Sequence, residues 1–172
     1  AEATIADIVS AIRELGGNPA RIGIGSPGLV DSRRGVVRIS PNLPQWENVP
    51  LADLVEKECG VPVRIANDVN AIAWGEFLFG AGCGCRDILV ITLGTGLGGA
   101  LILDGNLHKG KDETAGEIGH VTLIPDGFPC PCGNRGCLEQ YVGKNGIVRR
   151  ARALKKDLVD PTPETIAKSA AA

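Results

Sequence analysis

The segment from Ile88 to Leu93 reads Ile-Leu-Val-Ile-Thr-Leu, a run of aliphatic and β-branched residues without charge. A run of this length and composition is typical of a strand that is buried on both faces of a sheet. Such a sheet needs a covering layer on each face, and helices normally provide it. The run therefore predicts an α/β protein.

Helical and strand patterns alternate along the rest of the chain. We expect helices at 5–15, 51–58, 68–79, 138–142 and 146–154, and a helix that begins near Pro161 without a body. Strands are expected at 21–26, 36–39, 61–66, 88–93, 100–103 and 117–124, with an irregular loop at 40–46. The helix at 68–79 is expected to bury Val69, Ile72, Ala73, Phe77 and Leu78. Alternation of this kind is the pattern of an α/β fold.

The charge balance excludes several classes of protein. The 172 residues include 18 lysines and arginines and 20 aspartates and glutamates, for a net charge of −2. A general binder of nucleic acid or of anionic membranes carries a basic excess, so we expect neither partner for this segment. No apolar stretch approaches the roughly 18 residues that cross a bilayer. The chain lacks methionine and a signal-peptide pattern, which indicates a processed or cut chain.

Three of the six cysteines lie in one short segment, Cys130-x-Cys132-Gly133-x-x-Gly136-Cys137, which follows His120. Three thiolates and one imidazole match the four ligands of structural zinc, and the glycines allow the segment to fold back on itself. A disulfide with one spare thiol is the alternative, because Cys130 and Cys132 are separated by a single residue whereas zinc knuckles use two to four. Compartment and ligand chemistry favour zinc.

The remaining cysteines do not indicate a disulfide framework. Cys83 and Cys85 form a second Cys-x-Cys pair without a nearby histidine, so we expect ordinary core or loop residues; Cys59 has no predicted role. Disulfide frameworks serve short secreted chains that cannot build a core, whereas this chain has ample valine, isoleucine and leucine. We expect reduced thiols and a cytoplasmic protein.

A glycine-rich loop, Gly94-Thr95-Gly96-Leu97-Gly98-Gly99, lies between two apolar strands. Glycines here allow backbone N–H groups to approach phosphate oxygens. The loop has neither the helix start of a dinucleotide fingerprint nor the lysine of a Walker loop, and a structural β-turn uses the same residues. Both interpretations are open from the loop alone.

Polar side chains follow the strand that ends near Ala66. Asn67 or Asp68 suits the N-cap of the following helix, which is the usual role of these residue types. A carboxylate at the carboxyl end of a buried strand also faces the crevice in which open α/β sheets bind ligands, where it can serve as a general base.

A second acidic motif places Glu117 three residues before His120. On a strand the two side chains diverge, whereas in a turn they converge.

Taken together, these motifs resemble one protein family. They read Asn67-Asp68-x-Asn70-Ala71, Leu93-Gly94-Thr95-Gly96-x-Gly98-Gly99, Gly116-Glu117-x-Gly119-His120 and Cys130-x-Cys132-Gly133-x-x-Gly136-Cys137-x-Glu139. Their order and spacing are similar to those of the ROK family, which comprises repressors, open reading frames and sugar kinases, and most of all to its bacterial glucokinases. The resemblance covers about Ile22 to Arg152.

The resemblance implies the actin-like ATPase fold of the ribonuclease H-like, hexokinase type, with a sugar bound between two domains. Asp68 matches the general base that takes the proton of the sugar 6-hydroxyl as it attacks ATP. The sugar ligands implied are Asn42, Asn67, Glu117, His120 and Glu139. The resemblance places Gly94, Thr95 and Gly96 at the ATP phosphates, and implies a structural Zn²⁺ held by His120, Cys130, Cys132 and Cys137, with Mg²⁺ accompanying ATP.

The resemblance also implies that the chain is a central fragment. Family members begin with a strand and turn carrying Asp-x-Gly-Gly-Thr and end with a Gly-Gly adenosine motif, and this sequence contains neither. Residues 1–67 correspond to the end of the small N-terminal domain, and residues 68–172 to part of the larger domain with the zinc loop. The family often forms dimers, so a homodimer is compatible with the resemblance.

Hexose and ATP are therefore the expected ligands, and Glu117 and His120 favour glucose because they suit a pyranose with free hydroxyls at C1 and C2. An N-acylhexosamine or fructose kinase of the same family is one alternative. The sugar-sensing domain of a ROK transcriptional repressor, which has an N-terminal winged helix-turn-helix, is another. Residues before Ala1 discriminate between kinase and repressor.

Overall fold

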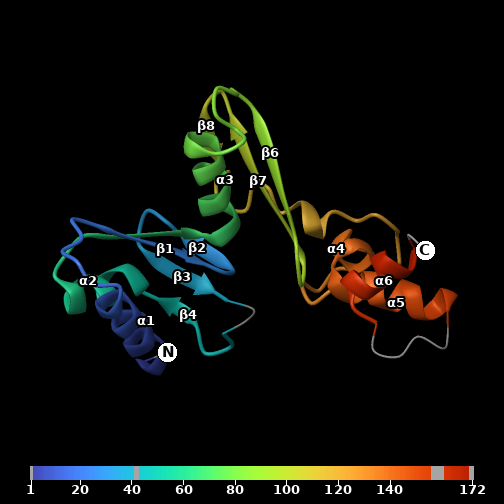
Figure 1. Ribbon diagram of the computed structural model, residues 1–172, viewed down its shortest axis with the longest axis horizontal. Coiled ribbons are helices and arrows are strands. Elements are labelled where there is room, and N and C mark those ends of the chain that lie inside the picture. The colour runs from blue at the N-terminus through green and yellow to red at the C-terminus, as the bar shows by residue number, and fades with distance from the viewer. Residues whose placement is uncertain (1, 41–42, 156–160, 171–172) are drawn as a thin grey trace. The chain divides into compact units, whose positions relative to one another are not determined.

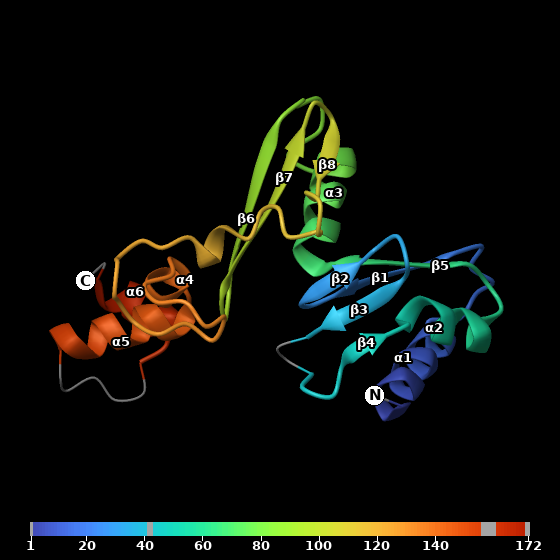
Figure 2. The same ribbon diagram turned by 180° about the vertical axis from the view of Figure 1, so that it is seen from behind.

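The computed structural model describes residues 2–40, 43–155 and 161–170 of the chain. The chain divides into two compact units (Figures 1 and 2). The first unit takes residues 1–88 and 102–115, and the second takes residues 89–101 and 116–172.

The first unit contains two small sheets with helices. Its elements are α1 (Glu2–Glu14), β1 (Ile22–Ser26), β2 (Leu29–Asp31), β3 (Val36–Ile39), β4 (Glu47–Val49), α2 (Leu51–Cys59), β5 (Val63–Asn67), α3 (Asp68–Phe79) and β8 (Asn106–His108). Strands β1 and β5 are parallel, from Ile22 opposite Val63 to Ser26 opposite Asn67. Strands β2, β3 and β4 form an antiparallel sheet in that order.

One apolar core holds these elements in place. Its buried members are Val30, Val37, Trp46, Val49, Leu51, Ala52, Val55, Val63 and Ile65, and the isoleucines of α1 at helical spacing pack against it. Helix α2 ends at Gly60, whose left-handed backbone (φ 73°) allows its N–H to bond the Glu56 carbonyl at 2.8 Å. The core thus fixes β5, which runs directly into α3 and sets the position of Asn67 and Asp68.

Helix α3 forms where the sequence predicts it, but the predicted burial is largely wrong. Ala73 is fully buried, whereas Ile72 is 49% and Leu78 43% exposed. Asn70, on the same side as Ala73, is buried instead. One narrow face of α3 contacts β1 and β5, so only the residues of that face lose solvent contact.

The second unit is built from a hairpin and three helices. Its elements are most of β6 (Ile88–Leu93) and β7 (Leu97–Leu103), the 3₁₀ turn η1 (Ile118–His120), α4 (Glu139–Val142), α5 (Lys144–Leu154) and α6 (Pro163–Ala170). Strands β6 and β7 are neighbours joined by residues 94–96, which is a hairpin connection. The division between the units therefore passes through both strands.

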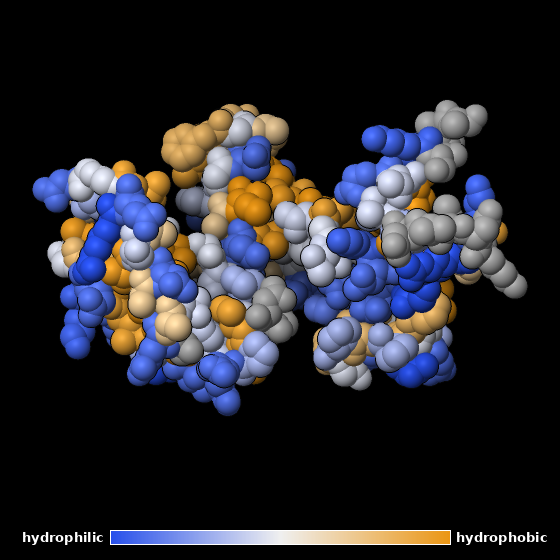
Figure 3. Space-filling model, turned by 60° about the horizontal axis from the view of Figure 1, so that its bottom comes forward, coloured by the Kyte–Doolittle hydropathy of each residue, from blue (hydrophilic) through white to orange (hydrophobic). Residues whose placement is uncertain are grey.

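Strand β6 differs from the doubly buried strand that its composition predicts. Leu89, Ile91 and Leu93 are 52%, 50% and 70% exposed, and the residues between them are half-buried. The expectation is wrong because, among the described residues, one face of this strand has no covering layer. Hydrophobic patches also interrupt the mainly hydrophilic surface visible in Figure 3.

Other elements also differ from expectation. The short strands β2, β4 and β8 were not predicted. Strand β8 follows Asp104 and Gly105, which both have positive φ (52° and 74°) as a type I′ hairpin turn requires. Helix α6 has a body of eight residues, because Pro163 occupies its first position and the Thr162 hydroxyl accepts the Thr165 N–H at 3.2 Å. The expected domain boundary after residue 67 stays a prediction.

Candidate functional site

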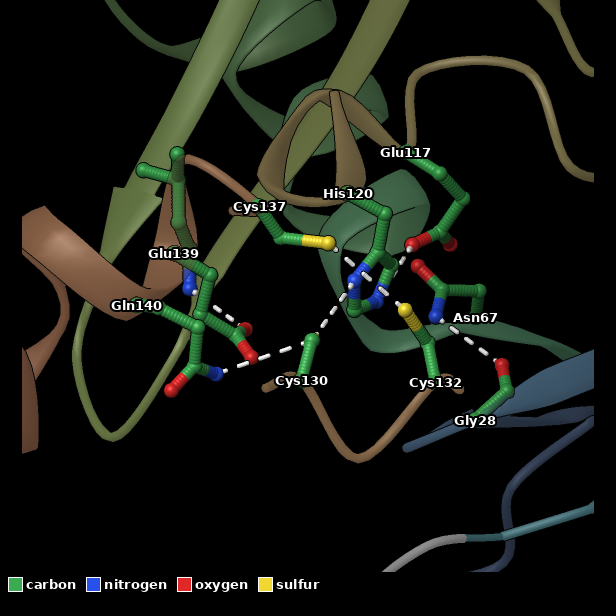
Figure 4. A network of polar contacts seen from close by, with 10 residues as sticks. Gly28, Asn67, Glu117, His120, Cys130, Cys132, Cys137, Glu139 and Gln140 are labelled. Atoms are coloured by element: carbon green, nitrogen blue, oxygen red, sulfur yellow. Dashed lines mark hydrogen bonds and ion pairs between the residues drawn. The ribbon is translucent and has the colours of Figure 1, made fainter. Parts of the chain in front are cut away.

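The four residues predicted as zinc ligands lie together in the second unit (Figure 4). One ligand atom from each of His120, Cys130, Cys132 and Cys137 lies within 4.8 Å of the other three. Cys130 Sγ is 3.6 Å from His120 Nδ1, and Cys132 Sγ is 3.7 Å from Cys137 Sγ. The thiols are free, so the alternative of a disulfide within this segment is not observed.

These separations fit the edges of a tetrahedron around zinc. With Zn–S near 2.3 Å and Zn–N near 2.05 Å, tetrahedral geometry places two sulfurs about 3.8 Å apart and a sulfur and nitrogen about 3.6 Å apart. The two separations above match these edges. The donor set, with three thiols and one imidazole, is that of a closed structural zinc site.

Burial and local N–H groups have opposite effects on the pKa values of the thiols. Burial, and after it the nearby Cys130 and Cys132 side chains, raise the pKa of Cys137 to about 12. The backbone N–H of Asn134 lowers the pKa of Cys132, against the opposing effect of burial. Converging thiolates repel one another, so this cluster favours a bound cation that stabilises the thiolate form.

Tight turns bring the three cysteines together. The Cys130 N–H bonds the Asn134 carbonyl at 2.9 Å, and Thr122 forms an isolated antiparallel bridge with Cys137. Gly133 and Gly136 have φ of 91° and 74°, values that disfavour a side chain. The segment thus folds back as its glycine spacing predicts.

Residues 117–124 do not form the expected strand. They begin with the 3₁₀ turn η1, which follows Gly116 at φ 91°. The turn brings Glu117 and His120 to the same side, with Glu117 Oε2 3.9 Å from His120 Nε2. Since Nδ1 of His120 faces Cys130, the two ring nitrogens face different partners.

The glycine loop contacts Glu139, another predicted site residue. Glu139 Oε2 accepts the Leu97 N–H at 3.0 Å (Figure 4). Within the loop, the Gly94 N–H bonds the Gly96 carbonyl at 3.0 Å, and Thr95 is exposed at the tip. The second unit therefore brings together Glu117, His120, Glu139, the three cysteines and the loop.

Asn67 and Asp68 lie in the first unit, at the junction of β5 and α3. Asn67 is the N-cap of α3: its Oδ1 accepts the Asn70 N–H at 3.1 Å, and its Nδ2 donates to the Gly28 carbonyl at 3.2 Å. Asp68 is half-buried in the first turn, where the helix dipole favours a negative charge. Asn42 lies outside the described residues.

Two groups of contacts were not predicted from the sequence. Gln140 Nε2 donates to Cys130 Sγ at 3.6 Å. The position of Gln140 directly after the predicted site residue Glu139 is the sequence signal that could have indicated this contact. In the first unit, Glu113 accepts the N–H and hydroxyl of Ser32 at 3.0 and 2.9 Å, and Lys109 Nζ donates to the same hydroxyl at 2.6 Å. No local pattern indicates this second network.

The other cysteines belong to the first unit. Cys59 is half-buried against the core of that unit, and Cys83 and Cys85 are exposed. The Cys83 thiol donates to the Leu78 carbonyl at 3.2 Å. Cys83 and Cys85 are ordinary loop residues, as expected. Among the helices of the described segments, none has the length and apolar character needed to cross a membrane.

Comparison with known proteins extends this description. A sequence model of the ROK family matches residues 2–171. Glucokinase from Streptomyces coelicolor is 42% identical over 165 residues, which cover 95% of this chain and 50% of that protein. The chain thus spans about half the length of this relative.

Solved structures show the same similarity. A ROK glucokinase from Streptomyces griseus, in complex with glucose and AMPPNP, has a TM-score of 0.79 and 41% identity, covering 91% of this chain and 52% of that chain. A ROK family transcriptional regulator, a homologue of the E. coli MLC protein, has a TM-score of 0.87 and 31% identity, covering 98% and 46%.

Proposed function

The chain belongs to the ROK family, and from this premise we propose that the complete protein transfers the γ-phosphoryl group of ATP to the 6-hydroxyl of a hexose, with glucose favoured. The α/β structure is part of the actin-like ATPase fold of ROK glucokinases, which confirms the predicted fold class. The observation that carries the proposal is the similarity to glucokinases in both sequence and structure.

Asp68 is proposed as the general base. Phosphoryl transfer mainly requires positioning and charge stabilisation, and a base oriented toward the attacking hydroxyl adds about 10²- to 10⁴-fold. The N-cap contacts of Asn67 fix the first turn of α3 and with it the backbone of Asp68. In the proposed reaction, the carboxylate accepts the 6-hydroxyl proton while the oxygen attacks the phosphorus.

The remaining roles follow the family pattern. Sugar hydroxyls are proposed to bind Asn42, Asn67, Glu117, His120 and Glu139, and the phosphates of Mg²⁺-ATP to bind Gly94, Thr95 and Gly96. Carboxylates and amides suit a ligand made of hydroxyls. The exposed tip of the hairpin suits phosphates, because its glycines leave the backbone accessible.

Zinc is proposed as a structural ion held by His120, Cys130, Cys132 and Cys137. When bound, it cross-links the segment that carries Glu117 to the segment that leads into Glu139. The His120 nitrogen that faces away from the cluster is then available to a sugar hydroxyl, with its tautomer fixed by ligation of the other nitrogen. We further propose a cytoplasmic protein, where thiols stay reduced and ATP is available.

A coupled assay of the full-length protein against a panel of hexoses with ATP tests this proposal. We expect turnover with glucose to exceed that with mannose, fructose, N-acetylglucosamine and N-acetylmannosamine. Absence of turnover with every sugar contradicts the kinase proposal, and preference for another hexose corrects the substrate. Size measurements in the same preparation test the homodimer.

The variant Asp68→Asn tests the base. We expect kcat to fall at least 10²-fold while the KM for hexose changes little, since the amide keeps the shape but cannot take the proton. Asp53→Asn is the matched control, because Asp53 lies in the first turn of α2 and is exposed. Retained turnover in Asp68→Asn excludes Asp68 as the base.

A sugar-sensing domain of a transcriptional repressor is the second candidate. The observation that favours it is the similarity to the ROK transcriptional regulator, whose TM-score is higher than that of the glucokinase. A full-length protein that binds hexose and a DNA operator without ATP turnover supports this candidate over the kinase.

A further inference from the structure

The backbone of Leu97, at the exit of the glycine loop, is held at both its N–H and its carbonyl. Its N–H bonds the Glu139 carboxylate at 3.0 Å. Its carbonyl packs against Gly119, where an added Cβ would lie only 2.1 Å from the oxygen. Leu97 is itself buried, so these contacts belong to the interior of the second unit.

The entrance of the loop is held by the same region of the chain. The Lys144 N–H, at the start of α5, bonds the Gly94 carbonyl at 3.0 Å. Gly143 packs closely enough that an added Cβ would lie 3.1 Å from the Thr95 carbonyl. The loop between β6 and β7 therefore rests on the turn that joins α4 to α5.

These contacts are adjacent to the Cys/His cluster along the chain. Gly119 directly precedes His120, and Glu139 follows Cys137 by two residues. The backbone between them is fixed, because the Leu138 N–H bonds the Val121 carbonyl at 2.9 Å. Each group that contacts the Leu97 backbone thus lies within two residues of a proposed zinc ligand.

We propose that Glu139 is a positioning residue that couples the Cys/His cluster to the glycine loop. A zinc-loaded cluster holds Glu139 against the Leu97 N–H, and this contact keeps the loop in one conformation. The inference rests on the proposed function for its consequence: the preformed loop binds nucleotide phosphates more tightly than a loop released from Glu139.

The two carboxylate oxygens allow Glu139 to serve two partners. Oε2 is taken by Leu97, while the carboxylate retains lone pairs for a sugar hydroxyl. A hexose that orders Glu139 therefore raises the affinity of the loop for nucleotide. Because binding free energies are reciprocal, bound nucleotide raises the affinity for hexose by the same factor. The side chain thus connects metal, sugar and phosphate contacts within one unit.

Hydrogen exchange of the Leu97 amide in the full-length protein tests the coupling without measuring activity. We expect the amide to be protected in zinc-loaded protein and to exchange at least about ten-fold faster after chelation of zinc or in Glu139→Gln, because a hydrogen bond to a charged acceptor is lost or weakened. Glu14→Gln is the control, since its exposed carboxylate accepts a hydrogen bond from Ser10 within α1 of the first unit.

A pair of alanine substitutions in the loop provides a matched comparison. A Cβ at Gly96 would lie 2.2 Å from Glu139 Oε2, whereas a Cβ at Gly94 meets nothing within 4 Å. We expect Gly96→Ala to displace the carboxylate and accelerate Leu97 exchange, and Gly94→Ala to leave Leu97 protected. If chelation of zinc unfolds the second unit, the comparison of Gly96→Ala with Gly94→Ala in zinc-loaded protein still tests whether Glu139 protects the Leu97 amide.

Calorimetric binding of AMPPNP completes the test. We expect Glu139→Gln to weaken AMPPNP binding about ten-fold or more at saturating zinc, because the hydrogen bond that holds the loop loses its charged acceptor. Equal Leu97 protection in all variants, or unchanged AMPPNP affinity in Glu139→Gln, overturns the coupling. If no hexose is phosphorylated but Leu97 exchange changes as expected, the proposed kinase activity is rejected, whereas the coupling of the cluster to the loop through Glu139 stands.

Discussion

Replacing Cys132 with serine removes one ligand of the proposed zinc site at its exposed edge. Cys132 lies 3.7 Å from Cys137, which is close to the tetrahedral edge of about 3.8 Å. A serine hydroxyl is a much poorer zinc ligand than a thiolate. Since Cys132 is exposed and packs no core, loss of the ligand dominates the effect of the substitution.

The expected loss of zinc affinity follows from the removal of one of the four proposed ligands. Loss of an outer contact to a metal ligand already costs 10- to 100-fold in affinity, so we expect loss of a ligand itself to cost at least about 100-fold. At free zinc 100 times the original Kd, zinc contributes about 2.7 kcal/mol of stability, and a 100-fold weaker site retains only about 0.4 kcal/mol. The zinc-dependent part of the unfolding free energy therefore falls by about 2 kcal/mol.

The assay combines competition with a chromophoric chelator and thermal unfolding of the full-length protein at buffered zinc. Cys85→Ser is the matched control, because Cys85 is also an exposed cysteine of a Cys-x-Cys pair. Zinc affinity of Cys132→Ser equal to that of Cys85→Ser refutes the ligand assignment. A protein without zinc-dependent stabilisation before any substitution refutes the site as a whole.

Three other predictions concern the first unit. The Arg38 guanidinium, and after it the Arg34 N–H, lower the pKa of Asp31 in the folded protein. The Asp31 carboxylate therefore stabilises the fold at pH values above its unfolded pKa of about 3.9, and this stabilisation is lost as pH falls through the lower folded pKa. In urea titrations, the unfolding free energy of Asp31→Asn should be lower than that of the unmutated protein at pH 7, and the two should converge in acid. Trp46→Ala, at a side chain that is 4% exposed, should cost about 3–5 kcal/mol in urea unfolding, and a loss below 1 kcal/mol contradicts the core assignment. Glu113→Gln weakens its contacts with Ser32 and should cost about 1 kcal/mol; a double-mutant cycle with Ser32→Ala that yields no coupling contradicts this link.

Local patterns predicted much of the fold. The apolar spacing of α1, the glycine that ends α2 and the polar pair that begins α3 all lie where the sequence indicates. These features depend on neighbouring residues, through helical periodicity, capping and left-handed backbone. Strand β8 has an equally local signal, because the pair Asp104-Gly105 that precedes it suits a type I′ turn.

Burial was less predictable than secondary structure. The composition of β6 indicates a strand covered on both faces, yet Leu89, Ile91 and Leu93 are exposed. An apolar side chain favours burial, but whether another layer covers it depends on the rest of the fold. The same reasoning explains the exposed residues of α3.

The fold class, the family motifs and the chemistry of the Cys/His donor set are readable from the amino-acid sequence, because they depend on residue type and short spacing. Three contacts instead depend on the tertiary fold: η1 turns Glu117 toward His120, Gln140 donates to Cys130, and Glu139 accepts the Leu97 N–H. Glu139 and Leu97 are 42 residues apart. Their contact arises from the tertiary fold of the second unit, and no local propensity of either segment specifies it.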